Sequence, residues 1–120
     1  LQLPEGSKAQ VLQGSSTQMF EFLASKGAKL DMLHLDGRLM KADLQLLGKL
    51  LKPDTLIALD DCEGDEKGHM NLDLLRRAGL IQQHAFVEPF PRALFRLWGL
   101  ETRSKTGFIL PQSSISFTRQ

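Results

Sequence analysis

Three carboxylates that follow two short apolar segments are the side chains of this chain best suited to chemistry. Asp36 ends the segment "LHLD", and the adjacent Asp60 and Asp61 end the segment "LIALDD". A charge at the end of a buried strand is costly unless another group compensates it. A hard divalent cation such as Mg²⁺, Ca²⁺ or Mn²⁺ prefers oxygen ligands and would compensate all three. The three acids together predict a ligand site, although any one of them alone could equally be a turn or helix-cap residue.

Two strands with a helix between them would have to position these acids. The segment "KLDMLHLDG" predicts a strand closed by Asp36, and "TLIALDD" predicts the next one. Between them, apolar residues at helical spacing predict a helix over residues 38–52, which Pro53 ends. Strands joined by a helix pair in parallel, and the ends of neighbouring strands lie about 5 Å apart. We therefore expect Asp36, Asp60 and Asp61 at one sheet edge, where open α/β sheets bind ligands.

The amino-terminal part of the chain predicts a further strand and helix. Residues 8–16, "KAQVLQGSS", contain a short apolar run that Gly14 stops. Ser15 followed by Gln18 fits a capping box at the start of a helix, and Gly27 stands where a helix C-terminal cap is expected. This part therefore reads as a strand followed by a helix.

The carboxyl-terminal part predicts one more helix and two strands. The polar segment "CEGDEKGHMN" indicates a loop, and residues 72–77 indicate a helix that Gly79 ends. "HAFVEPF" and "TGFILPQSSISFTR" predict strands, the last of them antiparallel at or near the sheet edge. The fold class predicted for the single domain 1–120 is α/β: a Rossmann-like three-layer α/β/α arrangement with a mostly parallel sheet and an antiparallel edge strand.

Composition narrows the classes of function. The chain has 120 residues, of which 42% are hydrophobic and 24% charged, as in ordinary globular domains. The net charge of +1 argues against a protein dominated by contacts to nucleic-acid phosphates. No segment has the roughly 18 consecutive apolar residues of a membrane helix. The single cysteine, Cys62, cannot form an internal disulfide, which is compatible with a cytoplasmic location.

Three motifs in order, "VLQGSSTQ", "LDMLHLDG" and "LLKPDTLIALDDC", resemble the carboxyl-terminal half of class I S-adenosylmethionine-dependent methyltransferases. The similarity is closest to cation-dependent small-molecule O-methyltransferases of the catechol and caffeoyl-coenzyme A type, and it covers about residues 8–90. It implies a small-molecule acceptor as partner, with no nucleic acid or membrane, and it leaves a homodimer open. The glycine-rich turn and the ribose-binding acid of this family would precede Leu1. We therefore expect the chain to be part of a larger domain and to be inactive alone.

The resemblance implies cofactor positions residue by residue. The turn formed by Gly14, Ser15 and Ser16 would border the adenine of S-adenosylmethionine, and Asp36 would lie near its methionine part. Asp36 would also ligate a divalent cation such as Mg²⁺, together with Asp60 and Asp61. The cation would bind a substrate hydroxyl, lower its pKa and orient the oxygen toward the methyl group.

The general base is less defined by the resemblance. Many relatives carry Lys or His three residues after the first acid, where this chain has Leu39. Lys41 and His34 are the candidate substitutes, and His34 shares the strand parity of Asp36. The alternatives for these two are a solvated helix charge and a hydrogen-bonded core or interface histidine. For the whole chain, the alternative function is a degenerate methyltransferase-like interaction module. An ATPase is a poor interpretation, because the chain has no GxxxxGK[ST] motif.

Overall fold

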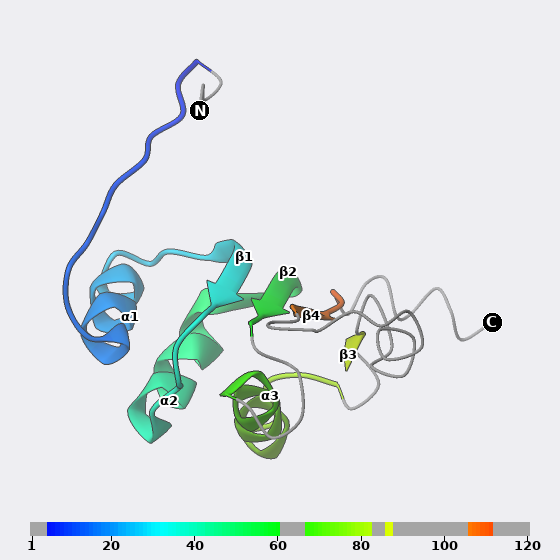
Figure 1. The fold of residues 1–120 in the computed structure, drawn as a ribbon. Coiled ribbons are helices and arrows are strands. Elements are labelled where there is room, and N and C mark those ends of the chain that lie inside the picture. Colours follow the sequence, from blue (N-terminus) through cyan, green and yellow to red (C-terminus); the bar gives the residue numbers. More distant parts are fainter. Residues whose placement is uncertain (1–4, 61–66, 83–85, 88–105, 112–120) are drawn as a thin grey trace, which may run out of the picture.

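The structure is a computed structural model that describes residues 5–60, 67–82, 86–87 and 106–111. These residues form a mixed four-stranded sheet and three helices, so the α/β class is confirmed (Figure 1). In chain order the elements are α1 (Ser16–Ser25), β1 (Leu30–Leu35), α2 (Lys41–Leu50), β2 (Leu51–Leu59), α3 (Lys67–Arg77), β3 (Phe86–Val87) and β4 (Gly107–Ile109).

The strands are ordered β1-β2-β4-β3 across the sheet. The expected parallel pair is present, because β1 and β2 run parallel with Leu35 opposite Leu59. Strand β4 runs antiparallel to both β2 and β3. The antiparallel strand therefore lies one position inside the edge, with β3 on its outer side, rather than at the edge itself.

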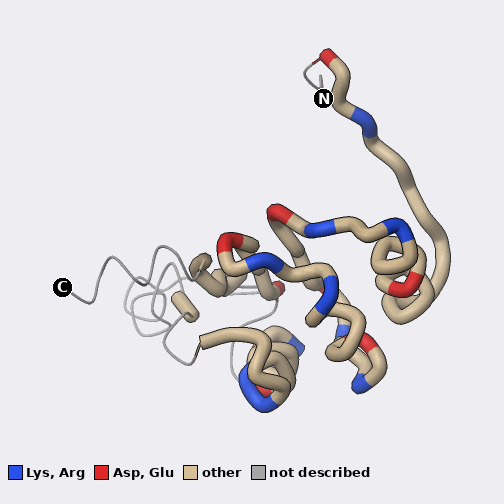
Figure 2. Tube along the Cα trace, turned by 180° about the vertical axis from the view of Figure 1, so that it is seen from behind, with Lys and Arg blue, Asp and Glu red and all other residues tan. Residues whose placement is uncertain are grey.

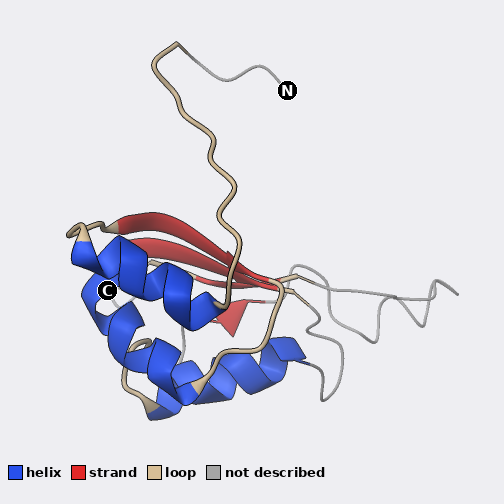
Figure 3. Cartoon of the chain, turned by 90° about the vertical axis from the view of Figure 1, so that its left-hand side faces the viewer, coloured by secondary structure: helices blue, strands red, loops and turns tan. Residues whose placement is uncertain are grey.

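The three helices cover one face of the sheet (Figures 1 and 3). The core between them combines side chains from all three helices and the sheet: Phe20, Leu35, Leu39, Leu47, Leu50, Ile57, Leu59, Leu72, Leu75 and Ile109. On β1, Leu35 faces this core, whereas Met32 and His34 are exposed. The described residues thus form two layers, a sheet and a helical layer, where the sequence predicted three.

Helix α1 has the ends that the sequence predicted. Ser15 accepts a hydrogen bond from the backbone N–H of Gln18, whose side chain accepts one from the backbone N–H of Ser15. Gly27, with a φ of 68°, follows the helix in the left-handed region, which costs glycine little. Phe20 is buried against the core, as expected for the apolar face.

The strand predicted before α1 is wrong. Residues 8–13 belong to no strand, are exposed and lead away from the sheet (Figure 1). Val11, which would be a core residue of such a strand, is 96% exposed. An extended segment without a neighbouring strand has no partners for its backbone hydrogen bonds, so a short apolar run alone does not make a strand.

The boundary between α2 and β2 also differs from the prediction. The helix ends at Leu50 and the strand begins at once at Leu51, so Pro53 lies inside β2. The register shifts there, since Leu30 is opposite Leu51 but Met32 is opposite Leu56. Proline lacks an N–H to donate and is tolerated at such an irregularity.

Helix α3 is longer at its start than predicted. It begins at Lys67 rather than at residue 72, so part of the expected polar loop is helical. Its end agrees with the prediction, because Gly79 has a φ of 72° directly after the last turn. The helices of the described residues lack the combined length and apolar character that crossing a bilayer requires.

Candidate functional site

The carboxyl ends of β1 and β2 place two of the three acids side by side. Leu35 is opposite Leu59 in the parallel register, and the backbone N–H of Asp60 donates to the carbonyl oxygen of Leu35 at 3.0 Å. The next residue of each strand end is an acid, and the side chain of Asp60 is near enough to that of Asp36 to affect its pKa. We call the carboxyl ends of β1 and β2, with Asp36 and Asp60, the acid rim. Asp61 lies outside the described residues.

Lys67, the first residue of α3, provides a cation at the acid rim. Its Nζ atom lies 2.9 Å from Oδ1 of Asp36 and 2.6 Å from the backbone oxygen of the same residue. The Lys67 side chain is 25% exposed and that of Asp36 is 65% exposed. The charge of Asp36 is therefore compensated from the neighbouring helix, by a residue that the sequence had placed in a loop.

The surroundings of Asp36 favour its ionised form. The hydrogen bond from Lys67 is the main cause that holds the pKa of Asp36 below its ordinary value, followed by the hydrogen bond with the Asp60 side chain and the charge of Lys67. His34 lowers this pKa slightly through its charge, and partial desolvation opposes these effects. Thr106, which directly precedes β4, contacts Asp60: its Oγ1 atom lies 3.4 Å from Oδ1 of Asp60.

The loop after Asp36 is fixed by Asn71 of α3. Its side-chain oxygen accepts from the backbone N–H of Leu39 at 2.9 Å, and its Nδ2 donates to the backbone oxygen of Gly37 at 2.7 Å. Asn71 is only 1% exposed, so the bond to Leu39 is buried and the bond to Gly37 is partly buried. Lys67 and Asn71 are four residues apart on one helix face, and α3 thus holds both the acid and the loop that follows it.

The same face of α3 contacts Arg38. The Nη1 atom of Arg38 lies 3.3 Å from the sulfur of Met70. Met70 is 44% exposed and Met40, at the other end of this loop, is 61% exposed. Exposed apolar and basic side chains therefore lie on the loop after Asp36 and on the adjoining face of α3.

The turn that was expected to border an adenine precedes α1. Gly14 has a φ of 151°, and a Cβ atom there would lie 2.8 Å from Oε1 of Gln18 and 2.9 Å from Cε of Met19. The hydroxyl of Ser15 is engaged in capping α1. In this turn, Gly14 is needed for a close approach of the chain to its own helix.

Ser16 is linked to the helix that follows β1. Its hydroxyl donates to Oδ2 of Asp43 at 2.7 Å, and the hydroxyl of Thr17 donates to Oδ1 at 2.6 Å. Asp43 is fully buried and also accepts from the backbone N–H of Met40 at 2.8 Å. These bonds bring the start of α1 to the start of α2, a few residues along the chain from Asp36. The hydroxyl of Ser16 is thereby already engaged.

The two candidate bases have different positions. His34 is exposed on β1, opposite Ala58, and is near enough to affect the pKa of Asp36. Lys41 is the first residue of α2 and is exposed; among the described contacts none joins it to Asp36 or Asp60. The structure therefore brings His34 to the acid rim and gives Lys41 no such link.

The fit of a divalent cation can be judged from the described side chains. Among them, no group of three or more His, Cys, Asp or Glu residues could hold a metal ion. Two predicted acid ligands, Asp36 and Asp60, are together, and the ammonium of Lys67 already contacts one of them. Water can supply several of the oxygen ligands of a hard divalent ion, but a neighbouring ammonium repels the ion. The described arrangement fits an ammonium better than a metal.

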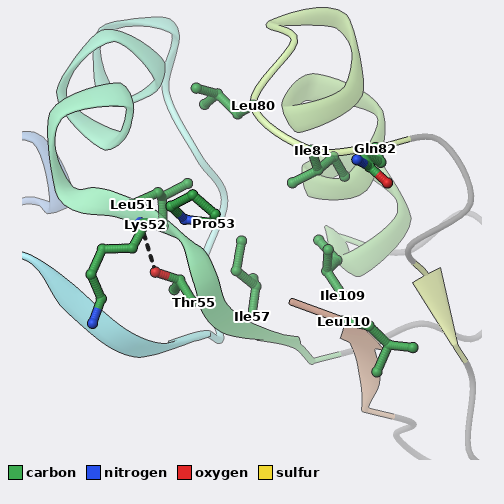
Figure 4. A pocket seen from close by; sticks show the side chains of 10 residues that line it. All are labelled: Leu51, Lys52, Pro53, Thr55, Ile57, Leu80, Ile81, Gln82, Ile109 and Leu110. Carbon is green, nitrogen blue, oxygen red and sulfur yellow. Dashed lines mark hydrogen bonds between the residues drawn. The ribbon is translucent and has the colours of Figure 1, made fainter. Parts of the chain in front are cut away.

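A hollow at the opposite end of β2 is less suited to chemistry (Figure 4). It is lined mainly by apolar side chains from β2, β4 and the segment after α3, including Ile57, Leu80 and Ile109. Its Thr55 hydroxyl already donates to the backbone oxygen of Leu30 and accepts from the N–H of Lys52. Ligands of open α/β sheets bind at the other, carboxyl end of the strands.

Charge does not single out another site. Figure 2 shows basic and acidic residues spread along the described chain. Another ion pair between neighbouring elements of the described residues joins Lys52 of β2 and Asp31 of β1, at the far end of these strands from the acid rim. This pair can serve as a control for the Lys67–Asp36 pair in mutagenesis, because it lies away from the acid rim.

A scan against protein-family models found no matching family. Searches of curated proteins and of solved structures likewise gave no significant match. The methyltransferase resemblance therefore stays a prediction from the motifs of the chain.

Sequence reasoning missed Lys67, Asn71 and Thr106. The sequence did contain a signal for a helix that starts at Lys67 and includes Asn71. Asp65 and Glu66 directly precede Lys67, and acids are favoured near the start of a helix. A helix beginning there would have put Lys67 and Asn71 on one face. No local pattern marks Thr106, whose contact with Asp60 depends on the pairing of β2 with β4.

Proposed function

We propose that this chain is the carboxyl-terminal part of an S-adenosylmethionine-dependent methyltransferase domain that methylates a hydroxyl of a small molecule. The observation that carries the proposal is the side-by-side placement of Asp36 and Asp60 at the carboxyl ends of neighbouring parallel strands. This is the edge at which open α/β sheets bind ligands.

The arrangement of elements supports the proposal. Helices α2 and α3 follow β1 and β2 in the chain, and the contacts of Asp43 bring the start of α1 to the start of α2. The finer fold proposed for the whole domain is the three-layer Rossmann-like arrangement. The described residues would supply part of its sheet and one helical layer.

The chemistry that this rim could perform is positioning of an acceptor. When bound, S-adenosylmethionine supplies a methyl group on a positively charged sulfur. Asp36 and Asp60 would accept hydrogen bonds from acceptor hydroxyls and orient one oxygen toward that methyl carbon. The oxygen–carbon bond forms as the carbon–sulfur bond breaks, the electron pair stays on sulfur, and the hydroxyl proton passes to a base. His34, exposed beside Asp36, is the proposed base.

Calorimetric titration of the complete encoded polypeptide with S-adenosylmethionine tests the proposal. The expected result is saturable binding of S-adenosylmethionine at one site per chain. The control variant Asp31→Asn, which changes the other end of β1, should bind the donor equally well. Because Asp36 is proposed to lie near the methionine part, Asp36→Asn should bind the donor more weakly. The absence of any binding would contradict the proposal and would favour an interaction module without catalysis.

A further inference from the structure

We infer that Lys67 is the resident cation of the acid rim and occupies the place on Asp36 where a divalent metal would bind. The inference rests on the proposed function, since it concerns the same rim. It differs from the expectation of a metal-assisted reaction, because the cation here is a side chain of the chain itself.

Two contacts of Lys67 fix the position of its ammonium at Asp36. Its ammonium donates both to the carboxylate and to the backbone oxygen of Asp36, at 2.9 and 2.6 Å. An ammonium has three N–H donors. Two of them are used by oxygens of the same residue, Asp36, so the Lys67 side chain is held at the end of β1. A lysine that merely balanced charge in solvent would need only the carboxylate.

The position of Lys67 is built by the rest of α3. Asn71, one turn further along the helix, is buried and bonds the backbone of Gly37 and Leu39 on either side of Arg38. The helix start and the loop after Asp36 are therefore held as one unit. Lys67 cannot leave Asp36 through a shift of α3 without breaking the two bonds of Asn71.

Asp60 is the second acid whose charge must be compensated at the acid rim. Two neighbouring carboxylates repel each other when both are ionised, so such a pair requires a cation or a shared proton. Asp36 and Asp60 follow the paired residues Leu35 and Leu59, and Lys67 brings a positive charge to Asp36. A metal ion at the same rim would lie beside this ammonium and would have to displace it. Lys67 is thus a positioning residue that keeps Asp36 in place without a metal.

Binding of Mn²⁺ to the complete polypeptide, followed by electron paramagnetic resonance, tests the inference without any catalytic readout. The expected result is that Lys67→Gln binds Mn²⁺ at least about tenfold more tightly than the unchanged protein, because a competing charge is gone. Lys52→Gln removes the counterpart lysine at the far end of the strands and should behave as the unchanged protein. Lys67→Arg keeps the charge and should also bind Mn²⁺ weakly.

The outcomes separate this inference from the proposed function. Equal or weaker Mn²⁺ binding by Lys67→Gln, or no binding by any variant, would overturn the role of Lys67. Neither result affects the titration with S-adenosylmethionine, whose failure would remove the proposed function instead. If Lys67→Gln does not fold, tight Mn²⁺ binding by the unchanged protein and by Lys67→Arg would overturn the inference, and weak binding by both would support it.

Discussion

The ammonium of Lys67 lies 2.9 Å from a carboxylate oxygen of Asp36, and it joins the first residue of α3 to the end of β1. This contact explains how an acid is tolerated at the end of a strand whose last residue, Leu35, is buried. Compensation comes mainly from a neighbouring element of the chain, the start of α3. Asp60, at the end of β2, lies against the same acid.

The pH dependence of Asp36 should change when Lys67 is replaced. Its pKa is lowered chiefly by the hydrogen bond from Lys67, so the folded state binds fewer protons than the unfolded chain near the ordinary value of about 3.9. The resulting stability is present above that value and is lost as pH falls through the lowered pKa. In Lys67→Gln, carbon-13 NMR of the Asp36 carboxyl should show a pKa closer to the ordinary value. An unchanged titration midpoint would show that the contact is unimportant in solution.

Replacement of Asn71 should destabilise the protein far more than an exposed helix substitution. Asn71→Ala leaves the buried N–H of Leu39 and the oxygen of Gly37 without their partner, which should lower the free energy of unfolding by about 2–4 kcal/mol. Gln45→Ala, at an exposed position of α2, should change it by no more than about 0.5 kcal/mol. Urea denaturation measures both. A loss below about 1 kcal/mol for Asn71→Ala would mean that water replaces these bonds readily.

Asp43 should be needed to hold α1 against α2. Asp43→Ala removes the acceptor of Ser16, Thr17 and the Met40 N–H, and we expect a loss of about 2–4 kcal/mol. Asp43→Asn should lose less, because an amide can keep part of these bonds. Asp73, which pairs with Arg77 on the exposed side of α3, offers the matched change Asp73→Ala. Thermal unfolding measures both variants, and Asp73→Ala should lower the stability much less than Asp43→Ala. An equal loss of stability in the two variants would contradict the role of the buried carboxylate.

Local sequence signals predicted a substantial part of this fold. Helix α1 follows from Ser15, Gln18 and Gly27, and the parallel pair follows from two apolar segments joined by a helix. The meeting of Asp36 and Asp60 follows from that pairing alone. These features depend on residues close in the sequence or on general rules of strand connection.

The remaining features depend on contacts between distant segments. Residues 8–13 have the apolar content of a strand but no partner strand, and Pro53 is accommodated in β2 by a shift of register. Lys67 and Asn71 gain their roles from a loop more than twenty residues away in the chain. Periodicity cannot reveal such contacts, because it describes one element at a time.

The most direct test of the account is transfer of a labelled methyl group from S-adenosylmethionine to dihydroxylated aromatic acceptors by the complete polypeptide. We expect methylated product with the unchanged protein and with Asp31→Asn. We also expect at least about a 100-fold loss of rate with Asp36→Asn, because the acceptor oxygen is no longer held in line. Product formed equally well by Asp36→Asn, or by none of the proteins, would contradict the assignment of Asp36 and Asp60 to the acceptor site.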